Sequence, residues 1–186
     1  MLSESMNNEE EFSGCLHPDG KIRVLSRRTV GKTINRMIHS IEKGQLVITH
    51  TLKLKPVIRA MGIYKPPKGY HYYDGFVLII RQFEKTGTVH TIRLTPAQLV
   101  LTLEGWVQAA DLKPESMKVA RLSRKIVKVG DNSEERRIIS YKDFKLIREY
   151  SMVRDIRWKL LVEEDSSYSA NGFFLRSIGF NKIGSH

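Results

Sequence analysis

The side chains with the clearest chemical potential are cations gathered in two stretches of the chain. Residues 21–68 hold twelve Lys or Arg against one acid, and residues 117–148 hold ten against four, within a formal net charge of +11. Such a surface attracts polyanions, either nucleic-acid phosphates through counterion release or anionic lipid headgroups. We expect the polyanion contacts to come from eight cations: Arg27, Arg28, Lys32, Arg36, Arg121, Arg124, Lys125 and Lys128. A solubilising surface charge without a partner is the alternative.

Catalytic and metal-binding patterns find little support in the sequence. The acids of residues 163–165 are adjacent, so the first two point to opposite faces of a strand and cannot form a facing acid and base pair. Residues 31–33 read Gly-Lys-Thr, but a phosphate-binding loop needs a Gly where Ser26 stands. Cys15 is the single cysteine, so it forms no internal disulfide and completes no zinc set. We therefore predict no enzyme, no metal and no cofactor.

Length and charge distribution predict one globular domain behind an acidic tail. The 186 residues are 41% apolar, enough for one core. Residues 1–20 carry five acids and no Lys or Arg, so we expect a flexible tail there and a globular domain at 21–186. The tail could cover the basic body or be inert. No apolar run approaches the roughly twenty residues of a membrane-spanning helix, so any membrane contact is expected to be peripheral.

Periodicity predicts the elements that must position these side chains. Val30, Ile34, Met37, Ile38 and Ile41 recur at helical spacing, which predicts a basic amphipathic helix from Ser26 to Gly44. It could pack on the core or lie on a membrane. Residues 45–55 alternate as a half-buried strand, in which His50 is expected to lie at the edge of the core.

Residues 56–75 form the longest irregular stretch and are rich in Pro, Gly and Tyr. A loop of this length in a compact domain is usually functional or mobile. We expect it to mediate self-association, with stacking on RNA bases or recruitment of host factors as alternatives. The residues that would carry self-association are Tyr64, Pro66, Pro67, Tyr70, Tyr72 and Tyr73.

The second half of the chain predicts alternating hairpins and helices. Residues 75–84 and 89–94 are expected to form a hairpin, and Thr95-Pro-Ala-Gln98 to cap a core helix that runs to Ala110. A cationic strand pair is expected at 118–128 and 136–140, followed by a helix that starts at Ser140. The resulting fold class is α+β: one domain in which an antiparallel sheet of hairpins carries packed helices.

The last thirty residues predict a terminal hairpin and carry a family resemblance. Trp158 to Glu164 and Gly172 to Phe180 alternate around a polar turn at Ser166 to Asn171. The order Leu161-Val-Glu-Glu164, a polar turn, a Gly followed by aromatics, then Leu175-Arg-Ser-Ile-Gly179 resembles the end of rhabdovirus matrix proteins of the vesicular stomatitis type. The resemblance covers about twenty residues.

The resemblance implies a viral matrix protein. Such a protein would self-associate into an oligomer or polymer, bind the nucleocapsid and its RNA, and join it to the anionic inner face of the envelope membrane. It would be found in the virion, at the inner membrane face and in the host cytoplasm, with the nucleus as a further location. Animal members carry a Pro-Pro-x-Tyr budding motif, whereas Pro66-Pro-Lys-Gly-Tyr70 is one residue too long, as expected of a plant-infecting relative. The alternative is a basic RNA-binding module.

Overall fold

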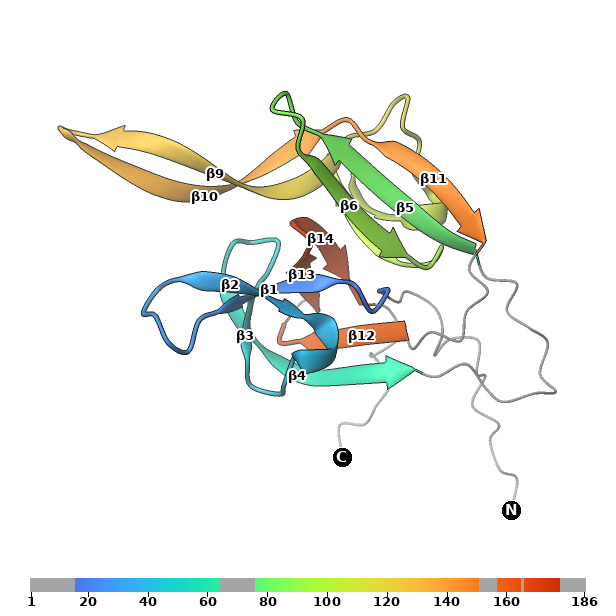
Figure 1. Ribbon diagram of the computed structural model, residues 1–186, viewed down its shortest axis with the longest axis horizontal. Helices are drawn as coiled ribbons and strands as arrows, with labels where there is room; N and C mark the ends of the chain where they lie inside the picture. The colour runs from blue at the N-terminus through green and yellow to red at the C-terminus, as the bar shows by residue number, and fades with distance from the viewer. Residues whose placement is uncertain (1–15, 64–75, 151–156, 165, 178–186) are drawn as a thin grey trace, which may run out of the picture.

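The computed structural model describes residues 16–63, 76–150, 157–164 and 166–177, and these residues fold almost entirely as antiparallel strands (Figure 1). They contain no α-helix and only two short 3-10 helices, so the prediction of an α+β fold with packed helices is wrong. The strands are β1 Lys21–Leu25, β2 Thr33–Met37, β3 Leu46–Ile48, β4 Leu54–Ile63, β5 Phe76–Phe83, β6 Val89–Leu94, β7 Leu99–Thr102, β8 Gly105–Gln108, β9 Val119–Val129, β10 Asn132–Lys142, β11 Lys145–Tyr150, β12 Arg157–Val162, β13 Ser167–Ala170 and β14 Phe173–Arg176. The 3-10 helices are η1 Ile38–Ser40 and η2 Ala109–Asp111.

The strands form one large sheet and one small one. The large sheet runs in the order β10-β9-β7-β14-β13-β1-β3-β4-β12, with β2 added beside β1 and β8 beside β7. The small sheet has the order β11-β5-β6. Strands distant in sequence therefore lie side by side, because β1 pairs with β13 and β4 pairs with β12.

The core is centred on β13 and β14, which come from the end of the described chain. Tyr168, Phe173, Phe174 and Leu175 have no exposed surface, and all four residues of β13 are buried. Strand β14 pairs with β13, β7 and β9 in turn. Burial on both faces explains the apolar run at the start of β14, whereas β13 keeps a polar alternation, Ser167-Tyr-Ser-Ala170, although all four residues are buried. Truncating one of the buried phenylalanines to alanine would cost about 3–5 kcal/mol.

Two predicted hairpins are confirmed. Strands β5 and β6 pair from Leu78 with Leu94 to Phe83 with Val89 around a turn that contains Gly87. Strands β9 and β10 pair over their whole lengths, and the tip of their hairpin extends beyond the other strands (Figure 1). In both, the strand pattern and the turn residues lie close together in the sequence, so local reasoning is sufficient.

The helix predicted from Ser26 to Gly44 is wrong, because this segment is the β1–β2 hairpin followed by η1. The Ser26 hydroxyl accepts hydrogen bonds from the backbone N–H groups of Arg28 and Thr29, and Gly31 has a φ of 72°. These are turn features, and they leave Val30 fully exposed at the tip of the hairpin. The apolar residues fit a helical period by coincidence.

The other two predicted helices are also strands. The segment after Thr95 forms the β7–β8 hairpin, in which Gly105 turns the chain with a φ of 115° before η2. The segment after Ser140 continues β10 and then forms β11, which pairs with β5. Pairing with distant strands overrides the local helical spacing in both cases.

The strands at 45–55 and at the end of the described chain also differ from expectation. Residues 46–48 and 54–63 are separate strands, β3 and β4, joined by a turn in which Leu52 has a φ of 62°. The supposed polar turn at 166–171 contains β13, so the terminal hairpin is β13–β14 and closes at Asn171 and Gly172. Strand β12 pairs instead with β4.

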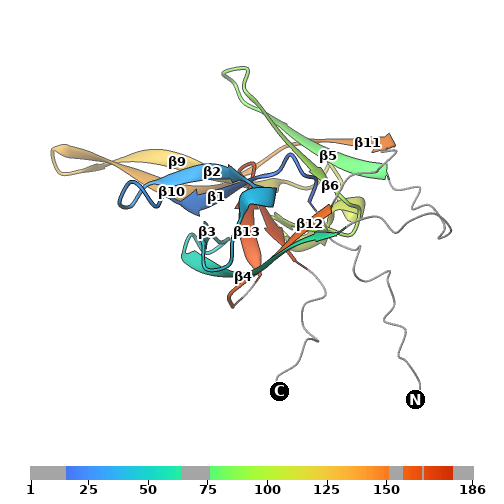
Figure 2. The ribbon, with the colours of Figure 1, turned by 60° about the horizontal axis from the view of Figure 1, so that its bottom comes forward.

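The two basic hairpins lie side by side. Figures 1 and 2 show β1–β2 running along β9–β10, and Arg137 Nη2 of β10 donates a hydrogen bond to Thr33 Oγ1 of β2 at 3.4 Å. The fold therefore brings the two cationic stretches of the sequence together. Among the residues that the structure describes, no helix is long and apolar enough to cross a membrane.

Candidate functional site

Leu16, at the start of the described chain, lies between β12 and β6 and forms a backbone bridge with each. Its N–H donates to the carbonyl of Trp158 at 2.9 Å, and the N–H of Trp158 returns a bond to its carbonyl at 3.0 Å. On the other side Leu16 forms a bridge with Leu94, and His17 N–H donates to Arg93 O at 3.2 Å. The Leu16 side chain has no exposed surface. Residues 16–20, the end of the expected acidic tail, thus belong to the folded unit.

Gln98 connects the turn after β6 to the end of β14. It is fully buried, and its Nε2 donates to Arg176 O at 2.7 Å and to Leu99 O at 3.1 Å. Its backbone also accepts a hydrogen bond from Ala109 N–H at 2.8 Å. The amide Oε1 has no hydrogen-bond partner in the part of the chain that the structure describes. A buried acceptor left in this way is uncommon and marks the position as unusual.

Ser177 brings the end of the described chain to the strand that holds its start. Its hydroxyl donates to Leu160 O, and its N–H donates to Ser166 O at 3.1 Å. Leu16 contacts Trp158, two residues earlier on β12, and alternate residues of a strand direct their backbone groups to the same edge. Leu16 and Ser177 therefore contact residues of β12 that are about 7 Å apart along one edge of the strand.

Arg176, Trp106 and His50 form a cluster of cationic and aromatic side chains at the end of β14. The guanidinium of Arg176 stands 5.8 Å from the Trp106 ring, and His50 meets that ring edge-on at 5.4 Å. His50 Nδ1 also lies 2.8 Å from the Ser167 hydroxyl. These contacts fix the position of Arg176, whose carbonyl accepts the Gln98 hydrogen bond.

The region around Leu16, Gln98 and Ser177, which we call the junction, is held by backbone hydrogen bonds and by one charged cluster. In this cluster Asp19 lies 2.8 Å from His17 Nδ1 and pairs with Arg93. Gln98 orients the Arg176 carbonyl with its Nε2 group, whose two hydrogens are both donated, and its remaining Oε1 can only accept a hydrogen bond; a neutral amide does not transfer a proton at pH 7. Lys159, between the two contact points on β12, is 3% exposed and is the one buried ammonium near the junction within the described ranges. No group of three or more His, Cys, Asp or Glu that could hold a metal occurs among the described residues.

The structure places the first set of predicted cations on the β1–β2 hairpin. Arg27, Arg28 and Lys32 are exposed at its tip, and Arg36 lies on β2. The Arg27 guanidinium pairs with Glu42 at 3.1 Å. Arg27, Arg28 and Arg36 line a common pocket, and Lys32 lies outside its lining. Their contact with a polyanion stays a prediction.

The second set lies along β9 and divides into buried and exposed members. Arg124, Lys125 and Lys128 are exposed, and Arg124 pairs with Glu135 at 2.8 Å. Arg121 is 8% exposed, and its Nη2 donates to Glu84 Oε1 at 2.6 Å.

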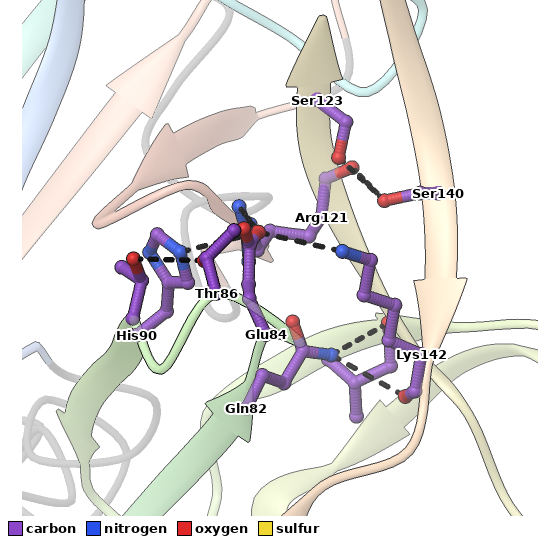
Figure 3. A network of polar contacts seen from close by, with 10 residues as sticks. Gln82, Glu84, Thr86, His90, Arg121, Ser123, Ser140 and Lys142 are labelled. Atoms are coloured by element: carbon purple, nitrogen blue, oxygen red, sulfur yellow. Dashed lines mark hydrogen bonds and ion pairs between the residues drawn. The ribbon is translucent and has the colours of Figure 1, made fainter.

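Glu84 is the hub of a charged network at the base of the β9–β10 hairpin. Figure 3 shows its carboxylate between Arg121, Lys142 and His90, and the last two lie 3.4 Å from it. The hydrogen bond from Arg121, with the charge of that guanidinium, lowers the pKa of Glu84. Burial, followed by repulsion from Arg121, lowers the pKa of His90. This network supports the hairpin, and its member His90 lines a pocket together with Asp19.

Sequence reasoning missed the junction residues. Leu16 stands in a polar stretch, and Gln98 was assigned to a helix cap, so nothing local indicated their burial. The predicted self-association loop, Tyr64 to Tyr73, and Cys15 lie outside the described residues.

The comparisons with known proteins find the fold and no family. No family model matches the chain, and no curated protein does. Among solved structures, a variant of the Ssp DnaB mini-intein is similar with a TM-score of 0.60 and 20% identity, over 95% of this chain and 97% of that one. The DnaB intein from Synechocystis sp. PCC 6803 gives 0.52 and 19%, over 89% and 99%. The gp41-1 intein gives 0.51 and 13%, over 89% and 99%.

These similarities overturn the rhabdovirus resemblance. The chain has the fold of the inteins across nearly its whole length, so the implied viral matrix function, with its virion assembly role, is wrong. The alternative of an RNA-binding module finds no support either. The residues that suggested a matrix protein, Leu161 to Glu164 and Leu175 to Gly179, belong in part to β12 and β14 of this fold.

Proposed function

We propose that this chain is a self-processing domain of the protein-splicing type, which rearranges the peptide bond between Gly14 and Cys15. The observation that carries the proposal is the convergence of Leu16 and Ser177 on one edge of β12. A domain that acts on the chain at its own boundaries needs those boundaries close together. The intein fold of the structural neighbours supports the same reading.

The reaction is an isomerisation that needs no cofactor. The Cys15 thiol attacks the carbonyl carbon of Gly14, the C–N bond to Cys15 breaks, and the proton lost by sulfur passes to the nitrogen that becomes a free amine. A thioester then links residues 1–14 to the Cys15 sulfur. A cysteine is suited to this step because its thiolate is a strong nucleophile even at a small population near pH 7.

The described residues Leu16, Trp158 and Gln98 contribute positioning. The paired bonds between Leu16 and Trp158 fix the backbone one residue after the reacting bond, which reduces the entropy of reaching the reactive geometry. Gln98 offers hydrogen bonding without proton transfer. We therefore expect a slow reaction that an added thiol draws forward by cleaving the thioester.

The test uses the full chain and intact mass spectrometry. After incubation with dithiothreitol at neutral pH, we expect loss of residues 1–14 and a product that begins at Cys15. The variant Cys15→Ala and the native protein unfolded in urea should both remain intact. The sequence-based prediction of no enzyme stays a prediction until then, and a native chain that stays as intact as Cys15→Ala would refute the proposal.

A further inference from the structure

A second feature of the fold, separate from the junction, is a pocket of about 200 Å³ between the two basic hairpins. Its walls come from β1, β2, β6, β9, β10, β13 and the β13–β14 turn, and four arginines line it: Arg23, Arg121, Arg124 and Arg137. Figures 1 and 2 show these hairpins lying along each other beside β13. Arg121 and Arg124 belong to the expected polyanion contacts, and the fold places Arg23 and Arg137 beside them.

The pocket holds an excess of two positive charges over its bonded acids. Glu84 pairs with Arg121 at 2.6 Å, and Glu135 pairs with Arg124 at 2.8 Å. Neither Arg23 nor Arg137 forms an ion pair with any residue in the described ranges. Arg23 is held instead by neutral partners, since its Nε donates to Thr33 Oγ1 at 3.0 Å and its Nη1 to Asn35 Oδ1 at 3.1 Å. Four guanidinium groups therefore face two carboxylates.

The cations of the pocket repel one another. Burial lowers the pKa of Arg23, and the charges of Arg124 and Arg137 lower it further, against a smaller opposite effect of Glu135. Like charges brought together in a partly desolvated site destabilise the folded state unless an anion compensates them.

Two buried donors of the pocket have no partner among the described residues. Arg121 is 8% exposed, and its Nη1 makes no hydrogen bond although Nη2 is held by Glu84. Ser169 is fully buried, and its hydroxyl is also unbonded. Buried donors without acceptors are rare in folded proteins, because each loses its hydration without replacement. Both groups line the same pocket, so one acceptor-rich ligand could satisfy them together.

We propose that this pocket binds a phosphate group, as inorganic phosphate or as a phosphate monoester. A tetrahedral dianion matches the two excess charges, whereas a single carboxylate would neutralise half of them. Its oxygens accept several hydrogen bonds at once, which suits guanidinium forks and the Ser169 hydroxyl. The pocket volume is several times the roughly 30 Å³ that one water molecule occupies in the liquid, so a phosphate group with bridging water fits.

Isothermal titration calorimetry of the full chain with inorganic phosphate tests this site at constant ionic strength, with chloride as the balancing anion. We expect saturable one-to-one binding, and at least tenfold weaker binding in Arg23→Gln and in Arg137→Gln. The matched control is Lys125→Gln, which removes one positive charge from exposed β9 outside the pocket and should leave the affinity within about twofold. Circular dichroism confirms that each variant is folded.

Two further measurements identify the preferred ligand and distinguish binding in the pocket from non-specific attraction to the basic surface. Titration with glycerol 3-phosphate is compared with titration with inorganic phosphate. The ligand that binds more tightly shows whether the pocket prefers a phosphate monoester or free phosphate. The His90 ring resonances should move on phosphate addition in the native protein and not in Arg23→Gln, because His90 lines the same pocket. Absence of saturable binding, or equal weakening in Lys125→Gln and Arg23→Gln, would overturn the proposal.

Discussion

Packing between Leu16 and Gly20 offers a quantitative test of how the start of the fold is anchored. A methyl group added at Gly20 would lie 2.7 Å from Leu16 Cγ, which is closer than real side-chain contacts. Gly20 has no positive φ, so its backbone can accept an L residue without conformational strain. The effect of Gly20→Ala therefore comes from collision with Leu16 rather than from the backbone.

The structure gives magnitudes for a double-mutant cycle. Leu16→Ala removes a fully buried side chain and should destabilise the protein by about 2–5 kcal/mol. Gly20→Ala overfills the same space and should cost about 1–3 kcal/mol. In the Leu16→Ala background the colliding atoms are gone, and the nearest remaining atom is His17 O at 3.2 Å. Gly20→Ala should then be close to neutral, since reduced entropy of the unfolded chain offsets part of the residual contact.

Urea unfolding followed by tryptophan fluorescence measures the cycle, because Trp158 lies beside Leu16. We expect a coupling free energy of at least about 1 kcal/mol, with the double variant more stable than the sum of the single changes predicts. Leu103→Ala, at a side chain 61% exposed, is the control and should change stability by less than about 0.5 kcal/mol. Additive effects of the two substitutions would refute the packing at Leu16.

Three other changes test separate parts of the molecule. Gln98→His should accelerate release of residues 1–14 at least about tenfold near pH 7, because an imidazole transfers protons where an amide does not; an unchanged rate by mass spectrometry would count against a role for this position. The pKa of Glu84 is lowered by the hydrogen bond from Arg121, so its stabilisation is present above the ordinary value of 4.5 and is lost as pH falls through the lower folded value. The stability difference between native protein and Glu84→Gln in urea should therefore shrink below pH 4.5, and a constant difference would contradict the pairing. Gly172→Ala should cost about 1–2 kcal/mol in thermal unfolding, since φ is 86° at this turn, and a neutral result would exclude the left-handed conformation.

The parts of the fold that could be predicted from sequence are those held by neighbouring residues. The β5–β6 and β9–β10 hairpins join strands through short turns with Gly87 and Gly130 in left-handed conformations, and both were predicted. The helical predictions failed where the partner strand is distant. Strand β1 pairs with β13 through Ile22 and Ala170, almost 150 residues apart, and no local period reports such a partner.

The same reasoning explains what was missed at the candidate site. Leu16 owes its burial to Leu94 and Trp158, and Gln98 owes its contacts to Arg176, all far along the chain. The charge excess between the basic hairpins was visible only in part, because Arg23 and Arg137 belong to different stretches of the sequence. Composition indicated a cationic surface, but only the pairing of strands shows which cations share a pocket.

The shared edge of β12 has a consequence for how this unit can be carried by other polypeptides. A surface loop of a host protein needs its two ends held close together, and Leu16 and Ser177 contact residues of β12 that are only about 7 Å apart. Grafting it between two adjacent residues of such a loop would leave the host strands in place and the unit outside their core. The closeness that we relate to peptide rearrangement therefore also makes the fold a compact insert.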